Sequence, residues 1–162
     1  MAELTQLESK LAEVIGLAQA AQDTTRKVIK LVDDDEVAAI LKRMRAESKE
    51  TADRGLALAG NLDGKKTAVQ KKARETKAEA TEMMQTYLGD DADALDGLEF
   101  MIMAEAGELG HVEIVSKMNE QVRDKEIAKL AKWALDVQSR HFEQTRQAAL
   151  KLAAQEDATG PE

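Results

Sequence analysis

Hydrophobic residues recur at intervals of three and four along most of the chain, the spacing that places them on one face of an α-helix. No stretch alternates hydrophobic and polar residues as a half-buried strand does. The first hydrophobic stripe covers residues 4–32, and the pair Thr5 and Glu8 forms a capping box at its start. Acidic residues 33–35 interrupt the stripe and can cap a second helix. The pattern predicts an all-α protein.

Turn residues divide the rest of the chain. The second helix ends at the turn residues around Gly60, and the highly charged segment 66–88 follows it. This segment is expected to form a helix on the outside of a bundle, because its hydrophobic stripe is thin: Val69, Ala73, Met83, Tyr87 and Leu88. A fourth helix is predicted from near Ala92. The last helix is predicted to run from Lys125 to about Ala154, with Asp124 as its N-cap.

The composition agrees with a single helical domain. Of the 162 residues, 43% are hydrophobic and only 2% are aromatic, and strong helix formers fill most positions. This length supports one substantial core, so residues 1–154 are assigned to one bundle and residues 155–162 to a disordered tail. The methionines are interpreted as core fillers rather than haem or copper ligands: Met83, Met84, Met101 and Met103.

Charge and missing residue types argue against several functions. The formal net charge of −8 opposes binding to nucleic acid or to anionic membranes. The absence of cysteine excludes disulfides, iron–sulfur sites and thiol chemistry. No apolar run approaches the roughly 20 residues that span a bilayer, and the first residues do not resemble a signal peptide. We therefore expect a cytoplasmic protein.

One carboxylate interrupts the hydrophobic stripe of the fourth helix. Leu98, Ile102, Leu109 and Val112 share one face of this helix, and Glu105 lies in the middle of that face, where a leucine is expected. A carboxylate on the core side of a helix is costly unless it is paired, protonated or bound to a metal. Glu105 is therefore the main functional clue in the sequence.

Glu108 and His111 follow on an adjoining face as an E-x-x-H pair, a spacing found in metal-binding helices. The same spacing suits an ordinary surface pair, with His111 expected near Lys132 of the last helix. Gly107 and Gly110 lie beside the pair, and each costs about 1 kcal/mol in a helix relative to alanine. We expect these glycines to admit a closely packed neighbouring helix rather than a local bulge.

The final turn, residues 119–124, fixes which residues of the fourth and last helices face each other. Extending the helices from this turn places Glu105 level with Gln138 and one turn from His141. Two interpretations follow. The residues are the surviving half of a metal site, or Glu105, Gln138, His141 and Thr145 form a buried hydrogen-bonded network that fixes helix register.

The two helical hairpins also resemble each other. The sequence VDDDEVAAILK, from Val32, aligns with VRDKEIAKLAK, from Val122. The same shift maps Glu105, Gln138 and His141 onto residues of which none is a strong metal ligand: Ile15, Ser48 and Thr51. Two hairpins joined by a long crossover give a four-helix bundle whose second and third core helices are parallel.

This topology, together with E-x-x-H, resembles the ferritin-like superfamily, and within it the YciF-type bacterial stress proteins. GELGHVEIV, from Gly107, is similar to their helix-three stretch EHYEIA. His111, Glu113 and Ile114 match that stretch, and Gly110 stands in place of its glutamate. The resemblance implies an up-down-down-up four-helix bundle with a long crossover that contains an extra helix.

The resemblance extends to the second helix. ESKETADRG, from Glu47, is similar to the family's second-helix motif, with Thr51 where a histidine is usual. In the superfamily, each hairpin typically contributes a glutamate and an E-x-x-H to a two-metal site. Here the first hairpin lacks them, and Glu47 and Glu50 are expected to point away from the stripe. The resemblance therefore implies a degenerate metal site.

The preferred hypothesis is a non-enzymatic, stress-associated, ferritin-like bundle without a cofactor. The alternative is an iron- or manganese-dependent oxidase or iron-handling protein that uses Glu105, Glu108, His111 and His141. A third hypothesis is a structural bundle whose acidic surface or segment 65–82 docks a partner. A homodimer or another protein partner is the expected interaction, and nucleic acid and membranes are not expected.

Overall fold

The computed structural model describes residues 2–160, and every regular element within them is a helix. The helices are α1 (Gln6–Ile29), α2 (Asp35–Gly60), α3 (Lys66–Tyr87), α4 (Ala94–Val122) and α5 (Lys125–Ala153). The all-α prediction is confirmed. The first helix ends at Ile29 and does not continue to Val32 as its stripe predicted. After Ala153 the chain leaves the helix, and residues 161–162 of the predicted tail lie outside the described range.

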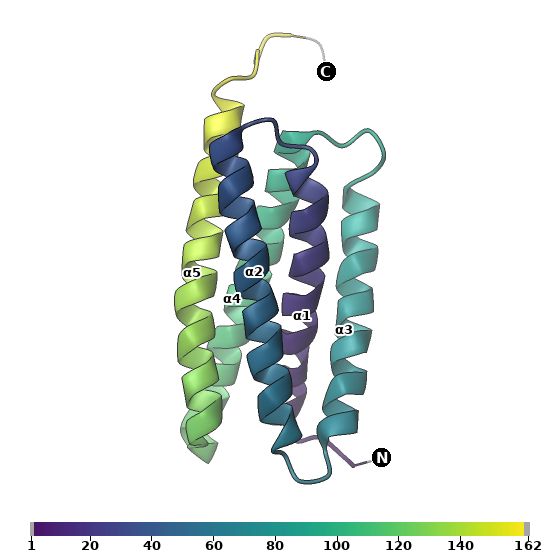
Figure 1. Ribbon diagram of the computed structural model, residues 1–162, viewed down its shortest axis with the longest axis vertical. Helices are drawn as coiled ribbons and strands as arrows, with labels where there is room; N and C mark the ends of the chain where they lie inside the picture. Colours follow the sequence, from purple (N-terminus) through teal and green to yellow (C-terminus); the bar gives the residue numbers. More distant parts are fainter. Residues whose placement is uncertain (1, 161–162) are drawn as a thin grey trace.

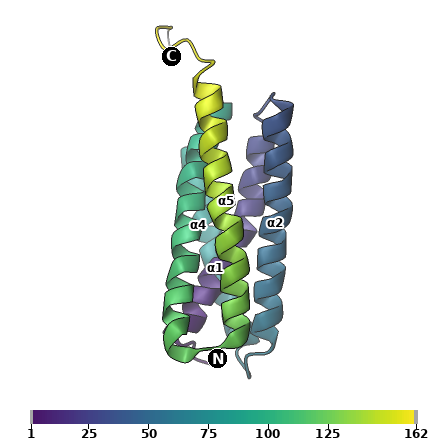
Figure 2. The ribbon, with the colours of Figure 1, turned by 90° about the vertical axis from the view of Figure 1, so that its left-hand side faces the viewer.

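Four helices form the core bundle, and the fifth lies outside it (Figure 1). The helix α1 lies beside α2 and α4, and α5 completes the ring by packing against the same two helices (Figure 2). In Figure 1, α2 and α4 both run downward, whereas α1, α3 and α5 run upward. Neighbouring core helices are therefore antiparallel, and α3 carries the chain back along the bundle while it packs mainly on α1.

Short polar side chains fix where the helices begin. Thr5 and Glu8 form the predicted capping box, in which the Thr5 backbone N–H donates to Glu8 at 2.7 Å and the Glu8 backbone N–H donates to the Thr5 hydroxyl at 3.2 Å. The carboxylates of Asp34, Asp93 and Asp124 accept from backbone N–H groups in the first turns of α2, α4 and α5. The exception is α3, because Lys65 makes no side-chain capping bond to its first turn.

The hydrophobic core consists of two clusters, one toward each end of the bundle. Leu11, Val112 and Leu130 belong to the first cluster. Leu41 and Leu98 belong to the second. On α2, α4 and α5, the residues between the two clusters include buried polar side chains. A polar layer therefore lies across the middle of the bundle.

The outer helix α3 buries less of its predicted stripe than expected. Val69 and Ala73 are buried against α1, but Met83 is 66% exposed and Tyr87 47% exposed, and Met84 is buried in their place. The reason is that α3 packs on α1 and leaves its side toward α4 largely uncovered.

None of the helices formed by residues 2–160 is long and apolar enough to cross a membrane.

Candidate functional site

The polar layer contains three of the four candidate ligands that the sequence placed on α4 and α5, namely Glu105, Glu108 and His141. Glu105 is 2% exposed and Glu108 7% exposed, and Gln138 and His141 are also buried. The predicted register of the α4–α5 hairpin is confirmed, because the Gln138 amide Nε2 donates to Glu105 Oε2 at 3.0 Å. The same nitrogen donates to Glu108 Oε2 at 3.1 Å. One amide on α5 thus joins two carboxyl groups on α4.

Burial is the main influence on the ionisation of Glu108. It raises the pKa of Glu108 well above its usual value, and the neighbouring Glu105 raises it further, while the hydrogen bond from Gln138 opposes both effects. A second carboxyl group in the same water-poor site disfavours a negative charge on Glu108. Glu108 therefore favours its protonated, uncharged form.

His141 lies between this pair of carboxyl groups and α2. Its Nε2 donates to Glu47 Oε2 at 2.7 Å, whereas its Nδ1, 3.5 Å from Glu105 Oε2, makes no hydrogen bond. Glu47 also pairs with Arg140 at 2.7 Å. Burial acts to raise the pKa of Glu47, but the hydrogen bonds from Arg140 and His141 outweigh it and hold the pKa below its usual value. Glu47 is therefore a carboxylate partner of His141.

The expectation that Glu47 points away from the core was wrong. The helical stripe of α2 places Glu47 at the edge of the buried face, but its long side chain reaches across to α5. Its carboxylate is held there by Arg140 and His141, two adjacent residues of α5. The similarity of the stretch beginning at Glu47 to a family motif was the one sequence signal that could have indicated its role.

The structure separates His111 from the other candidates. Its Nε2 lies 3.5 Å from Glu13 of α1, and its Nδ1 lies 2.8 Å from the carbonyl oxygen of Gly107. The surface pair of Glu108 and His111 is not formed, because Glu108 turns into the core toward Gln138. The expectation that His111 lies near Lys132 was also wrong, since His111 faces α1.

The two glycines beside this pair do not mediate helix packing. A Cβ atom added at Gly107 or Gly110 would have no non-neighbouring heavy atom within 4 Å. The prediction of close packing was therefore wrong for this chain. By contrast, a Cβ at Gly16 would collide with the backbone of Ala73, so the close approach of α1 and α3 depends on that glycine.

Thr145 also differs from its predicted role. Its hydroxyl points to the sulfur of Met44, at 3.8 Å, and does not join Glu105 or His141. The buried hydrogen-bonded network therefore consists of Glu105, Glu108 and Gln138, and the bond between His141 and Glu47 lies beside it without joining it.

The residues of this layer do not fit a two-metal centre. The counterparts of the candidate ligands in the first hairpin are buried and offer only methyl and hydroxyl groups: Ile15, Ser48 and Thr51. The Thr51 hydroxyl accepts a hydrogen bond from the Trp133 indole at 3.2 Å. On α5, an amide stands where a third carboxylate would be needed. In the described part of the chain, no group of three or more His, Cys, Asp or Glu side chains is arranged to hold a metal ion.

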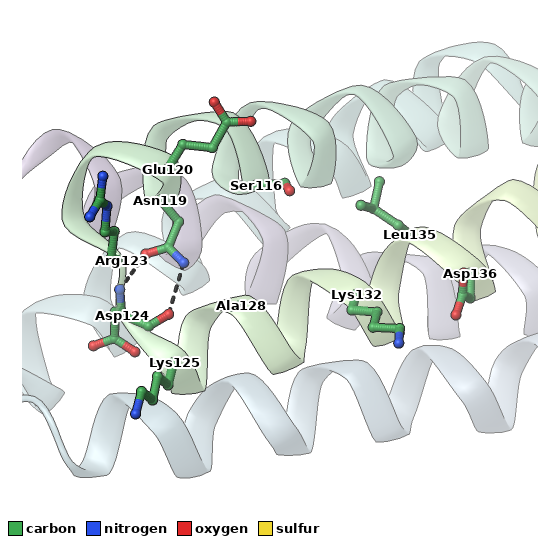
Figure 3. Close-up of a pocket in the computed structure, with 10 residues that line it drawn as sticks. All are labelled: Ser116, Asn119, Glu120, Arg123, Asp124, Lys125, Ala128, Lys132, Leu135 and Asp136. Atoms are coloured by element: carbon green, nitrogen blue, oxygen red, sulfur yellow. Dashed lines mark hydrogen bonds between the residues drawn. The ribbon is translucent and has the colours of Figure 1, made fainter.

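A separate hollow of about 470 Å³ lies at the turn between α4 and α5 (Figure 3). The Asn119 amide there donates to the Asp124 carbonyl at 2.8 Å and accepts from the Asp124 N–H at 3.1 Å. These bonds close the turn, in which Arg123 has a φ of 59°. Both polar atoms of the Asn119 amide are therefore occupied by the turn and are not free to bind a ligand in this hollow.

Comparison of the chain with protein-family models, with characterised proteins and with solved structures found no match.

Proposed function

We propose that the protein is a non-enzymatic helical bundle of the ferritin-like type, in which the metal site has degenerated into a buried hydrogen-bonded acid. The helix directions support this arrangement, because α2 and α4 run parallel and α3 forms the long crossover between them. The association with stress responses in the bacterial cytoplasm rests on the sequence resemblance to YciF-type proteins.

One observation carries the proposal. The Nε2 group of Gln138 donates to both Glu105 and Glu108, so an uncharged amide provides the partner that a metal ion would otherwise provide. The amide nitrogen is not a useful metal ligand, whereas a carboxylate in its place would be. The opposing hairpin adds only Ile15 and two hydroxyl residues. This chemistry favours a structural network over a redox centre.

The test is elemental analysis of the full chain purified without added metal, with Gln138→Glu as the matched variant. We expect the wild type to hold far less than one iron, manganese or zinc ion per chain and to consume no oxygen when ferrous iron is added. Gln138→Glu places a third carboxylate beside the first two and should increase metal affinity. Two iron atoms per wild-type chain, or oxygen uptake by the wild type, would show that the proposal is wrong.

A further inference from the structure

A groove between α1, α3 and α4 is a concave, largely apolar surface beside the polar layer. It exists because α3 packs on α1 and scarcely contacts α4. Its volume is about 260 Å³, and apolar side chains from all three helices form most of its wall: Leu17, Ala21, Met83, Phe100, Met103 and Ala104. We call this space the α1–α3–α4 groove.

Three features of the groove wall are not explained by close packing within the chain. Met83 is 66% exposed and Met103 50% exposed at its wall. Gly107 also lines it, and a Cβ atom there would enter open space. A glycine in a helix interior costs about 1 kcal/mol relative to alanine, and methionine adapts its shape to different apolar ligands. Together these features suit a ligand more than internal packing.

Acidic side chains lie at both ends of the groove. Glu108 lines its inner part, where its raised pKa favours the uncharged acid. A second, more open hollow of about 560 Å³ shares Met83, Phe100 and Met103 with it and is lined by Glu79 and Glu82. In the described part of the chain, neither hollow has a lysine or arginine in its wall. His111 is the only basic side chain that lines the groove, and it faces Glu13 at 3.5 Å.

We propose that the α1–α3–α4 groove binds a small amphiphile with a single aliphatic chain and a cationic amine head. The aliphatic chain lies along the apolar wall over Gly107, and the head lies in the outer hollow between Glu79 and Glu82. This inference goes beyond the proposed function and does not depend on metal binding.

The orientation follows from desolvation. An ammonium group keeps most of its water in the open outer hollow, whereas burial beside Glu108 would remove that water at high cost. Tyr87 also lines the outer hollow, and an aromatic face attracts an ammonium or quaternary amine. The size follows from the volume, because ligand pockets span roughly 300–1,000 Å³ and the groove, at about 260 Å³, lies just below that range and suits only a small ligand.

The test is titration calorimetry of the full chain at neutral pH with three amphiphiles that share a decyl chain, each below its micelle concentration. Decyltrimethylammonium carries a positive head, decanoate a negative head and decyl glucoside an uncharged head. We expect saturable binding of about one decyltrimethylammonium per chain, weaker binding of the glucoside and the weakest binding of decanoate. Equal affinity for decanoate, or no binding of any of the three, would overturn the proposal.

Gly107→Leu places a side chain in the groove, and Gly110→Leu is the matched control, since Gly110 lies one turn away and does not line it. Both changes replace a helical glycine with a good helix former, so both variants should fold. We expect at least a tenfold loss of decyltrimethylammonium affinity in Gly107→Leu and little change in Gly110→Leu. Equal affinities in the two variants would place the ligand elsewhere.

A second pair of variants tests the head group. The double change Glu79→Gln with Glu82→Gln should weaken decyltrimethylammonium binding by roughly three- to tenfold, the scale of two exposed charge interactions, and leave the glucoside unchanged. The control pair, Glu113→Gln with Glu120→Gln, removes the same two negative charges at sites away from both hollows. An equal loss in both pairs would show that only overall charge attracts the amine, which would contradict the assigned head position.

Discussion

Gln138 Nε2 lies 3.0 Å from Glu105 Oε2 in the middle of the bundle. The amide of α5 thus donates a hydrogen bond to the carboxylate that interrupts the hydrophobic stripe of α4. The same nitrogen lies 3.1 Å from Glu108 Oε2. A single NH₂ group thus satisfies one oxygen of each acid, one hydrogen for each. The arrangement stabilises the two carboxyl groups only while their mutual repulsion is relieved by a proton.

This relation predicts a pH-dependent stability that Glu108→Gln removes. The pKa of Glu108 is raised by burial and by Glu105 well above the ordinary value of 4.5 that applies to the unfolded chain. The folded chain therefore binds this proton more tightly than the unfolded chain does. The stabilisation that the Glu108 proton gives the folded chain is complete below about pH 4.5. It is lost as the pH rises through the folded-state pKa of Glu108.

The measurement is urea unfolding of the wild type and Glu108→Gln between mildly acidic and neutral pH. Relative to the variant, the wild type should lose up to about 1.4 kcal/mol of unfolding free energy per pH unit, the slope for one proton. Glu113→Gln, an exposed change on the same helix, is the control and should keep the wild-type slope. Parallel profiles for the wild type and Glu108→Gln would mean that Glu108 ionises normally.

Glu105 and His141 are predicted to differ in their effect on stability. Glu105→Leu makes the stripe of α4 continuous and removes the repulsion of Glu108, while Gln138 keeps its bond to Glu108. The variant should be as stable as the wild type or more stable. His141→Ala removes the partner of Glu47 and leaves a cavity, so it should cost roughly 1–3 kcal/mol.

Urea unfolding in metal-free buffer measures this contrast. An equal loss of stability in both variants would mean that Glu105 supports the fold beyond its own desolvation cost. If the two variants lose stability relative to the wild type only when metal is supplied, Glu105 and His141 are ligands.

The features that sequence could predict are those set by local geometry. The caps at Thr5 and Asp124 follow from short polar residues before hydrophobic stripes. The pairing of Glu105 with Gln138 follows from a short turn, because a hairpin of two helices has little freedom in its register. Periodicity and turn chemistry are therefore enough to predict the helices and the pairing of Glu105 with Gln138 in the polar layer.

The missed features depend on contacts between distant helices. Glu47 reaches His141 across the α2–α5 interface, whose register is set by the whole bundle and not by a turn. The exposure of Met83 depends on the angle and position at which α3 packs on α1, and the hydrophobic stripe of α3 does not determine them. Composition could not distinguish a methionine in the core from one at the wall of a groove.

The turn between α4 and α5 provides a prediction about its two unusual residues. Asn119→Ala removes both bonds to the Asp124 backbone and should cost roughly 1–3 kcal/mol. Arg123 has a positive φ of 59°, a conformation that glycine adopts without strain, so Arg123→Gly should stabilise the protein by up to about 1 kcal/mol. Thermal unfolding would check both, and destabilisation by Arg123→Gly would show that its side chain stabilises the turn.

The glycines of the bundle provide the final prediction, because the same substitution should have opposite effects at different sites. At Gly107 and Gly110 a Cβ meets open space, so alanine should stabilise each helix position by about 0.5–1 kcal/mol through reduced backbone entropy in the unfolded chain. At Gly16 the added Cβ collides with the Ala73 backbone, and at Gly55 it would lie 2.5 Å from Ile15. Alanine at Gly16 should separate α1 from α3 and cost roughly 1–3 kcal/mol, and alanine at Gly55 should force Ile15 to repack at a similar cost.

Urea unfolding of the four single variants checks the contrast. Stabilisation at Gly16 would mean that α1 and α3 are not in close contact in solution, and destabilisation at Gly107 would mean that its open side is already occupied.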